Sequence, residues 1–92
     1  MPTKPVFLRW EHTTPPHCKF YEVEVELSLF YPKLLVRRWG RIGGKRSHSI
    51  RLLVADGEEL QRQVVRIGRR RQAHGYRLVQ ELQVAAMAGA AA

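Results

Sequence analysis

The sequence predicts an α+β fold, a small antiparallel sheet of about three to five strands with one main helix packed on one face. Three features predict it. Residues 21–29 alternate strictly between apolar and polar side chains, which is the period of a strand with one buried face. Residues 34–42, LLVRRWGRI, follow a short loop segment as the return strand of a hairpin. Residues 58–74 then place apolar side chains at helical spacing.

The first elements along the chain are expected to be antiparallel strands. Residues 6–11 predict a short strand, which ends at residues 13–16 because the prolines there cannot continue a sheet. The strand over residues 21–29 turns at residues 30–33 and returns over residues 34–42. The hairpin formed by these two runs is the clearest element of the sequence.

The register of this hairpin is predicted from both of its faces. With Leu29 opposite Leu34, the glutamates of the first strand meet basic or aromatic residues, and apolar pairs meet on the other face. Trp39 then shares a face with Arg37 and Arg41, and this face is not the one that the helix covers. The predicted partners are Glu26 with Arg37, Glu24 with Trp39, Glu22 with Arg41, Leu27 with Val36, and Tyr21 with Ile42.

A glycine turn and a third strand are expected next. Gly43 and Gly44 turn the chain, and residues 46–55 predict a strand with alternate side chains on one side. Gly40 lies on the other face of the strand from Trp39 and allows the helix or another backbone to approach closely. The side chains expected on one side of the third strand are His48, Ile50, Leu52 and Val54.

The helix over residues 58–74 has two acidic residues in its first turn, where the macrodipole favours them. Gly75 is a suitable residue to end it. Residues 76–82 predict either a closing strand or a short helix. The apolar stripe of the helix consists of Leu60, Val64 and Ile67, continued by the stem of Arg71.

Length and composition indicate one domain over residues 1–92, with a core over about residues 18–80 and a frayed alanine-rich end over residues 84–92. No apolar run reaches the roughly 18 residues that a membrane-spanning helix needs. The first residues lack the apolar core of a signal peptide, and Cys18 is the only cysteine. These features predict a cytoplasmic protein without an internal disulfide.

The charge is strongly positive and unevenly distributed. The net charge is +8, and residues 37–77 alone carry +9, with twelve Lys and Arg against three acids. Such an imbalance favours a polyanionic partner, either a nucleic acid or an anionic membrane surface. A charge excess that only keeps the protein soluble is the alternative.

Trp39 lies between arginines in the run RRWGRIGGKRSHS, residues 37–49. An indole can stack on a base or a ribose, and guanidinium groups bind phosphates bidentately. The turn over residues 43–46 adds backbone amides and two cations for a further phosphate. The alternative is a self-contained surface stack, in which Trp39 lies between Arg37, Arg41 and the neighbouring glutamates.

The run RRWGRIG closely resembles the WGR domain, with the alternating strand FYEVEVELSLF before it and a helix ending in RRRQAHGY after it. Trp39-Gly40-Arg41 is the motif that names this family. The resemblance covers residues 20–76, or slightly more. It implies a small antiparallel sheet with a helix packed across it, which agrees with the fold predicted above.

The resemblance also implies a function. WGR domains occur in DNA-damage-responsive poly(ADP-ribose) polymerases, where they bind DNA at a break, and short bacterial proteins consist of little more than this domain. By resemblance, Trp39 would pack against the sugar or base at a strand terminus. Arg41 would contact the backbone or a partner domain. The sequence carries no polymerase domain.

Other clusters of chemically active residues favour structural roles. Adjacent His17 and Cys18 point to opposite faces of a strand, and no metal-binding spacing links them to the other histidines, so we expect no metal and no cofactor. No residues complete a Cys-His nucleophile site. The alternating glutamates of residues 22–26 predict a ladder of ion pairs rather than acid–base catalysis. We therefore expect a protein that is not an enzyme.

The sequence as a whole predicts a binding module for nucleic acid, most simply DNA ends or nicks, with little sequence specificity. RNA binding is a weaker option. The alternative from another class is an adaptor that docks an acidic partner protein through the same surface. Of the basic run 69–71, the sequence does not show which arginine faces a ligand. The candidate nucleic-acid-binding residues are Arg37, Trp39, Arg41, Lys45, Arg46, Arg51 and Arg70.

Overall fold

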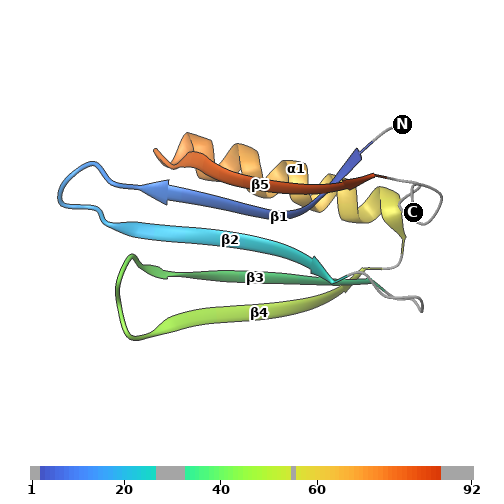
Figure 1. Cartoon of the computed structure of the whole chain (residues 1–92), viewed down its shortest axis with the longest axis horizontal. Coiled ribbons are helices and arrows are strands. Elements are labelled where there is room, and N and C mark those ends of the chain that lie inside the picture. Colours follow the sequence, from blue (N-terminus) through green and yellow to red (C-terminus); the bar gives the residue numbers. More distant parts are fainter. Residues whose placement is uncertain (1–2, 27–32, 55, 86–92) are drawn as a thin grey trace.

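The computed structural model describes residues 3–26, 33–54 and 56–85. It confirms the predicted α+β fold, with five antiparallel strands in one sheet and one helix on one of its faces (Figure 1). The strands lie in the order β4-β3-β2-β1-β5. The elements are β1 (Thr3–His12), β2 (Lys19–Glu26), β3 (Lys33–Arg41), β4 (Ser47–Val54), α1 (Gly57–Ala73) and β5 (Arg77–Ala85).

The core lies between α1 and one face of the sheet, which we call the helix face. The apolar stripe predicted for the helix is confirmed, because Leu60, Val64 and Ile67 are buried against this face. Trp10 of β1 lies in this core and is 5% exposed. The sheet contributes Leu8, Trp10, Tyr21, Val23, Val25, Leu35 and Val54 to the same core.

Both ends of α1 are capped by local hydrogen bonds. The Asp56 side chain accepts a hydrogen bond from the Glu59 backbone N–H at 2.8 Å, as an N-cap residue does. At the other end Gly75 has φ of +89°, which confirms the expected glycine at the helix end. The Tyr76 N–H donates to the Arg71 carbonyl oxygen at 3.0 Å. This closing turn directs Tyr76, 9% exposed, back into the core.

The two terminal strands pair with each other. Residues 77–85 form a strand, β5, and not the short helix that was the alternative. This strand pairs antiparallel with β1, which is longer than predicted and lies inside the sheet between β2 and β5. Residues 86–92, where fraying was expected, lie outside the described residues.

The predicted register of the β2–β3 hairpin is wrong by three residues. Tyr21 lies opposite Trp39, Val23 opposite Arg37, and Glu24 opposite Val36. An odd shift exchanges the two faces of a strand, so Arg37, Trp39 and Arg41 lie on the helix face and not with the glutamates.

The prediction failed because it assumed a four-residue loop and counted only apolar and charged matches. β2 ends at Glu26 and β3 begins at Lys33, so the connection that sets the register is longer. The predicted pairs that involve Leu27 or Leu29 lie outside the described residues. The observed register still satisfies the glutamates, because Arg38 meets Glu22 and Glu24 on the face away from the helix.

Gly40 and Gly43 have distinct structural roles beside Trp39. A Cβ at Gly40 would lie 3.0 Å from the Arg46 carbonyl oxygen and 3.3 Å from the Phe20 ring. Close approach of another backbone was predicted here, and it comes from the start of β4 rather than from the helix. Gly43 has φ of +75° in the predicted turn between β3 and β4.

Candidate nucleic-acid interface

One row of aromatic side chains crosses the helix face at the level of Trp39. Trp10, Tyr21, Trp39 and His48 are successive cross-strand partners on β1, β2, β3 and β4. The Tyr21 and Trp39 ring centroids lie 5.8 Å apart with an angle of 12° between the planes. The Trp39 and His48 centroids lie 5.7 Å apart at 22°. We call these four residues the aromatic row.

The aromatic row runs from the core to the surface. Trp10 and Tyr21 are buried under α1, Trp39 is half-buried, and His48 is exposed. Trp39 is therefore both a core residue and a surface residue. Because neighbouring rings stack along both of its faces, the indole offers its outer edge to solvent rather than a free face.

Two arginines lie against the buried part of the row. Arg37 Nε donates a hydrogen bond to the Tyr21 hydroxyl at 2.5 Å. The Arg71 guanidinium carbon lies 4.3 Å from the Tyr21 ring centroid and 5.2 Å from that of Tyr76. Such cation–π contacts hold a guanidinium in place while its outward N–H groups stay available to an acceptor. Arg71 Nε is buried and has no hydrogen-bond partner among the described residues.

A shallow pocket of about 250 Å³ opens between these side chains. We call it the aromatic pocket. It combines flat apolar surface with two guanidinium groups, a combination suited to a sugar or base that carries phosphate. Its lining consists of Tyr21, Arg37, Trp39, Arg71 and Tyr76.

Two further cations lie on the other side of the row, toward the end of the sheet. Arg41 is exposed and lies opposite Lys19, whose Nζ is 5.9 Å from the Tyr76 ring centroid. Cations that are direct cross-strand neighbours repel each other. Neither forms an ion pair with a described carboxylate, so this juxtaposition favours an external anion.

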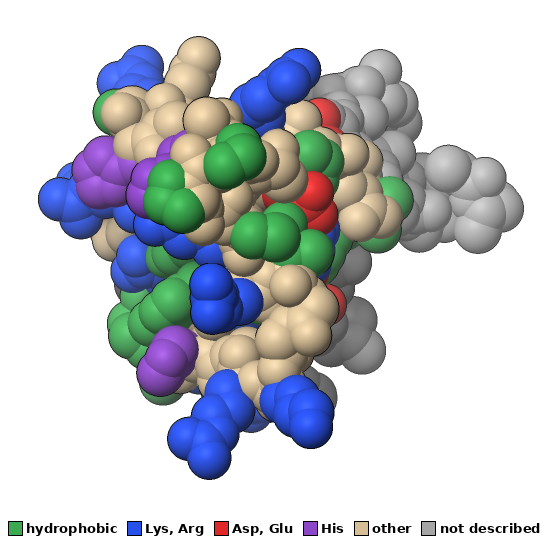
Figure 2. All heavy atoms as spheres, turned by 90° about the vertical axis from the view of Figure 1, so that its left-hand side faces the viewer, with side chains coloured by type: hydrophobic (Ala, Val, Ile, Leu, Met, Phe, Trp, Pro, Cys, Tyr) green, Lys and Arg blue, Asp and Glu red, His purple; other side chains and the backbone are tan. Residues whose placement is uncertain are grey.

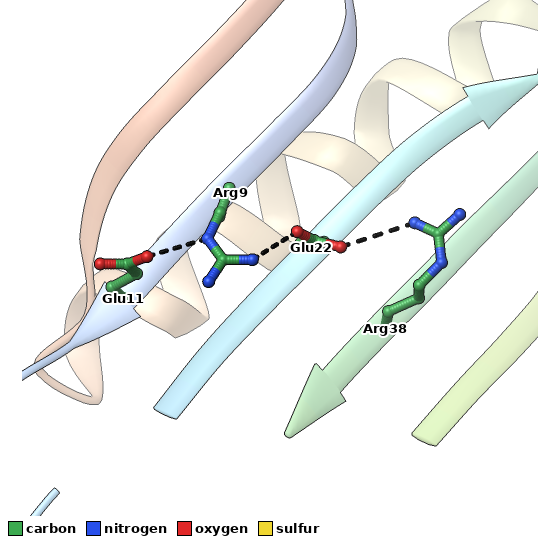
Figure 3. A network of polar contacts seen from close by, with 4 residues as sticks. All are labelled: Arg9, Glu11, Glu22 and Arg38. Atoms are coloured by element: carbon green, nitrogen blue, oxygen red, sulfur yellow. Dashed lines mark hydrogen bonds and ion pairs between the residues drawn. The ribbon is translucent and has the colours of Figure 1, made fainter. Parts of the chain in front are cut away.

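The glutamates of β1 and β2 lie on the opposite face of the sheet, which we call the ladder face. There Glu22 bridges Arg9 at 2.5 Å and Arg38 at 3.6 Å (Figure 3). Glu11 adds a pair with Arg9 at 2.9 Å, and Glu24 one with Arg38 at 2.8 Å. Burial opposes the charge of Arg9, but its hydrogen bonds to Glu11 and Glu22 outweigh this and raise its pKa. The predicted ladder of ion pairs is confirmed, with these two arginines as partners.

The sequence model of the WGR domain matches residues 6–83. The chain belongs to the WGR family. WGR domains are nucleic-acid-binding modules. No curated protein and no solved structure matches this chain.

The structure brings together most of the residues that the sequence selected around the WGR motif. Arg37, Trp39 and Arg41 lie on the helix face, with Lys45 and Arg46 exposed at the adjoining turn. One amide of this turn is not free, because the Gly44 N–H donates to the Arg41 carbonyl oxygen at 3.0 Å.

Arg51, which the sequence grouped with Trp39 as a nucleic-acid-binding candidate, does not share its face. Arg51 pairs with Val36 and is exposed on the ladder face, because it alternates with Ile50 and Leu52 along β4. The expected grouping of His48, Ile50, Leu52 and Val54 on one side of β4 is confirmed, and that side is the helix face.

The three consecutive arginines at the end of α1 lie in three different places. Arg71 lies over Tyr21 in the aromatic pocket. Arg70 lines a neighbouring pocket together with Arg37. Arg69 lies on the other side of α1, in a groove shared with β5.

Sequence reasoning missed Lys19, Tyr21 and Arg66 as parts of this surface. The signal for Arg66 was present, because it shares a helix side with Gln63, three residues before, and Arg70, four residues after. Lys19 and Tyr21 follow from the correct hairpin register only, since they are the cross-strand partners of Arg41 and Trp39.

Figure 2 shows the end of the molecule where the strand connections and the end of α1 meet. Lys and Arg side chains surround this end, acidic side chains are sparse, and histidines lie among the basic groups. Hydrophobic side chains are exposed between them. Such a mixture of cations and apolar surface is typical of proteins that contact both the phosphates and the sugars or bases of a nucleic acid.

A larger groove of about 650 Å³ lies between α1 and β5, floored by Leu8 and Trp10. Its rim carries charges of both signs, including Arg69, Arg77 and Glu81. It therefore lacks the single-sign field that a polyanion requires, and we do not place the nucleic acid there. Within the described part of the chain, no group of His, Cys, Asp or Glu is arranged to hold a metal ion. No described helix is long and apolar enough to cross a membrane.

Proposed function

We propose that this WGR domain is a non-catalytic module that binds DNA at ends or nicks through the helix face around Trp39. The observation that carries the proposal is the half-buried indole between Tyr21 and His48, with cations on both sides of the row. No described carboxylate pairs with Arg37 or Arg71, which line the pocket beside the indole.

The geometry of Trp39 favours a strand terminus. Since both indole faces lie against other rings, a base from within a duplex has no free face to stack on. The exposed edge of the ring can instead pack against a sugar, and a terminal sugar is the most accessible one. This agrees with the role that the family resemblance implies for the motif.

The position of α1 explains why little sequence specificity is expected. Its apolar side is buried against the sheet through Leu60, Val64 and Ile67. A helix held across a sheet in this way does not present its length to the major groove, where base edges are distinguished. Phosphate contacts supply most of the affinity instead, without reading sequence.

The test is fluorescence anisotropy with three DNAs of equal length: blunt with a 5′ phosphate, nicked, and closed by a hairpin at both ends. Trp39→Ala is expected to weaken binding to open DNA by about tenfold, or about 1.4 kcal/mol, because the packing of the ring edge against the terminal sugar is lost. Binding to the closed DNA is expected to change little. Circular dichroism checks that the variant is folded.

Arg41→Gln and Arg51→Gln form a matched pair. Both residues are exposed arginines on neighbouring strands, but on opposite faces of the sheet. Arg41→Gln is expected to weaken DNA binding several-fold, while Arg51→Gln leaves it nearly unchanged. Equal losses in both variants would reduce the interaction to general charge attraction and contradict the proposed surface.

Salt dependence measures how many phosphates the surface contacts. If about five are engaged, log K falls against log salt concentration with a slope of about −4 to −5 on duplex DNA. A slope near zero is incompatible with the proposal. Competition between matched DNA and RNA duplexes tells which nucleic acid is preferred.

The second candidate function is an adaptor that binds an acidic partner protein through the same surface. Ile50 favours it, because this apolar side chain is 44% exposed directly opposite Arg37. An apolar contact surrounded by cations suits an acidic protein segment. Absence of DNA binding at moderate salt, with the helix face intact, would favour this function over the first.

A further inference from the structure

The groove of about 650 Å³ on the β5 side of α1 runs along an edge of the sheet. β1 pairs with one side of β5, and no described strand pairs with the other side (Figure 1). The outer backbone N–H and C=O groups of β5 therefore form a template for a further strand. We call this groove the edge groove; it lies between residues 64–72 and residues 76–81, over Leu8 and Trp10 of β1.

The floor and both rims of the edge groove are apolar. Leu8 and Trp10 are buried at its floor. Val65 of α1 lies on one rim with 42% of its surface exposed, and Leu78 of β5 lies on the other with 50% exposed. An apolar side chain that enters the groove would remove both rims from water, which is favourable.

Gly68 leaves room for such a side chain. It lies in α1 above Trp10, and a Cβ built on it would be 3.4 Å from Trp10 Cζ2. Apart from the nearby helix backbone, no other described atom lies within 4 Å of that position. The space above Trp10 is therefore open because residue 68 has no side chain.

Charge is unevenly distributed along the edge groove. The chain reverses between Ala73 at the end of α1 and Arg77 at the start of β5, so the last turns of the helix lie beside the first residues of the strand. Arg69 and Arg77 therefore line the same end, and neither forms an ion pair with a described carboxylate. Glu81 lines the groove further along β5, about 13 Å from Arg77 at the rise of a strand. A complementary ligand carries its negative charge at the Arg77 end.

We propose that the edge groove binds an extended segment of a partner protein, which adds a sixth strand to the sheet along β5. The segment is apolar where it lies over Trp10 and acidic toward its C-terminal end. Antiparallel addition is the more stable arrangement, and it places the C-terminal end of the segment beside Arg77, the first residue of β5. In this mode of recognition, backbone hydrogen bonds supply the affinity and side-chain pockets supply the specificity.

This site is separate from the surface proposed for DNA. The edge groove and the aromatic pocket share Tyr76 alone among their lining residues. A partner segment in the edge groove therefore leaves Trp39 accessible, and the domain can hold DNA and the partner at the same time. An adaptor that used the helix face around Trp39 would instead make the two ligands compete.

The probe is a peptide of about eight residues, the length of a strand, in which valine alternates with threonine before two C-terminal glutamates. Its matched control has the same composition in reverse order, and both peptides are acetylated and amidated at their ends. Anisotropy measures their affinity for the full chain. We expect the probe to bind about tenfold more tightly than the reversed peptide, and Arg69→Gln/Arg77→Gln to remove this difference. Equal binding of the two peptides, or no binding of either at millimolar concentration, overturns the proposal.

Gly68→Leu is expected to block the groove, because it places a side chain in the space above Trp10. Binding of the probe should weaken by about tenfold. The matched control is Gln61→Leu, which adds the same side chain to the exposed side of α1 outside the edge groove. It is expected to leave the affinity for the probe unchanged. Circular dichroism checks that both variants are folded, and equal losses in both would contradict the assignment to the groove.

Hydrogen exchange followed by NMR tests the added strand itself in the unsubstituted chain. The probe is expected to slow exchange at those N–H groups of β5 that point away from β1, because they become bonded to the peptide. Exchange in β4, the opposite edge of the sheet, is expected to stay unchanged. Protection in β4 instead, or binding without protection in β5, overturns the proposal.

DNA and a second copy of the chain supply the remaining outcomes. Saturating DNA is expected to leave the affinity for the probe nearly unchanged, and displacement of the probe by DNA would overturn the separation of the two sites. Dimerisation in analytical ultracentrifugation that Gly68→Leu removes would identify a second copy as the occupant and overturn the partner segment. Binding of the probe without any binding of DNA supports this inference and contradicts the proposed function alone.

Discussion

The two faces of this sheet both carry arginines in rows, yet they use them in opposite ways. On the ladder face, Arg9 and Arg38 are paired by glutamates of the neighbouring strands. On the helix face, Arg37 and Arg71 contact aromatic rings and no described carboxylate. Successive residues of a pleated strand point to opposite sides. Arg37 therefore lies on the helix face, and adjacent Arg38 lies on the ladder face.

The difference separates stability from binding. Paired charges that are partly shielded from water hold strands together, but few of their N–H groups remain available to a ligand. Unpaired cations contribute repulsion to the folded protein, and an external polyanion relieves it. The net charge of +8 therefore understates the positive field of the helix face, because the ladder face uses three of the eight acids.

Gly40 is a position at which one substitution is expected to affect both faces of the sheet. Gly40→Ala places a methyl group on the ladder face, 3.0 Å from the Arg46 carbonyl oxygen and 3.3 Å from Ser47 Cα. Both are backbone atoms, so β3 and β4 must move apart, and we expect a loss of about 1–3 kcal/mol in the free energy of unfolding. Because β4 carries His48 to the side of Trp39, DNA affinity is expected to fall as well. Urea denaturation and anisotropy measure the two effects.

Gly68→Ala is the control for this change. Its Cβ would lie 3.4 Å from Trp10 Cζ2, an ordinary contact, and the residue is within α1. Alanine in a helix is favoured over glycine by about 1 kcal/mol, so this variant is expected to be as stable as the parent or more stable. If Gly40→Ala behaves like Gly68→Ala, the close approach of β4 does not constrain the motif.

The ladder face is tested by Glu22→Gln, which removes the carboxylate shared by Arg9 and Arg38. The Glu22 side chain is 16% exposed, so its ion pairs are intermediate between surface and buried ones. We expect a loss of about 1–2 kcal/mol in the free energy of unfolding, without loss of DNA affinity. Glu59→Gln, which breaks an exposed pair within α1, is expected to cost less stability than Glu22→Gln. A fall in DNA affinity for folded Glu22→Gln would refute the separation of the two faces.

Much of the fold was predictable from local patterns. The alternation around Val23 and Val25 predicted β2, and the stripe of Leu60, Val64 and Ile67 predicted α1. Both patterns repeat within a single element, so they can be recognised without knowing which other element packs against it. Residues 76–82 stayed ambiguous, because whether they form a strand depends on pairing with β1, which is distant in the sequence.

The candidate site was less predictable than the fold, and the hairpin register is the reason. Charge matching of Glu22 with Arg41 gave a plausible hairpin. In the observed register, Tyr21 lies opposite Trp39 and stacks on it. A register error of an odd number of residues moves every side chain to the other face. The motif residues Arg37, Trp39 and Arg41 thus share one face as predicted, while Arg51 and the partners of Trp39 were placed wrongly.

The smallest expected effect is a pH dependence at the edge of the helix face. Burial, then the charges of His17 and Lys19, lower the pKa of His12 below its usual value of 6.5. The folded state therefore prefers the neutral imidazole. The contribution of His12 to the free energy of unfolding is therefore complete above the pKa of the unfolded state. It decreases as the pH falls from there toward the pKa of the folded state. His12→Phe, which keeps a ring against Tyr76, is expected to flatten stability between pH 7.5 and 5.5.

Bound DNA makes this prediction specific to the helix face. Protonation of His12 adds a cation beside Lys19, which lies opposite Arg41, so the free protein gains repulsion as the pH falls. DNA phosphates on the same surface would favour the protonated imidazole and reduce the pH dependence of stability. Thermal unfolding with and without DNA at each pH measures this coupling, and His17→Gln tests the contribution of the neighbouring ring. An unchanged pH dependence with DNA bound would place the phosphates away from His12 and restrict the interface to the side of Trp39 that faces α1.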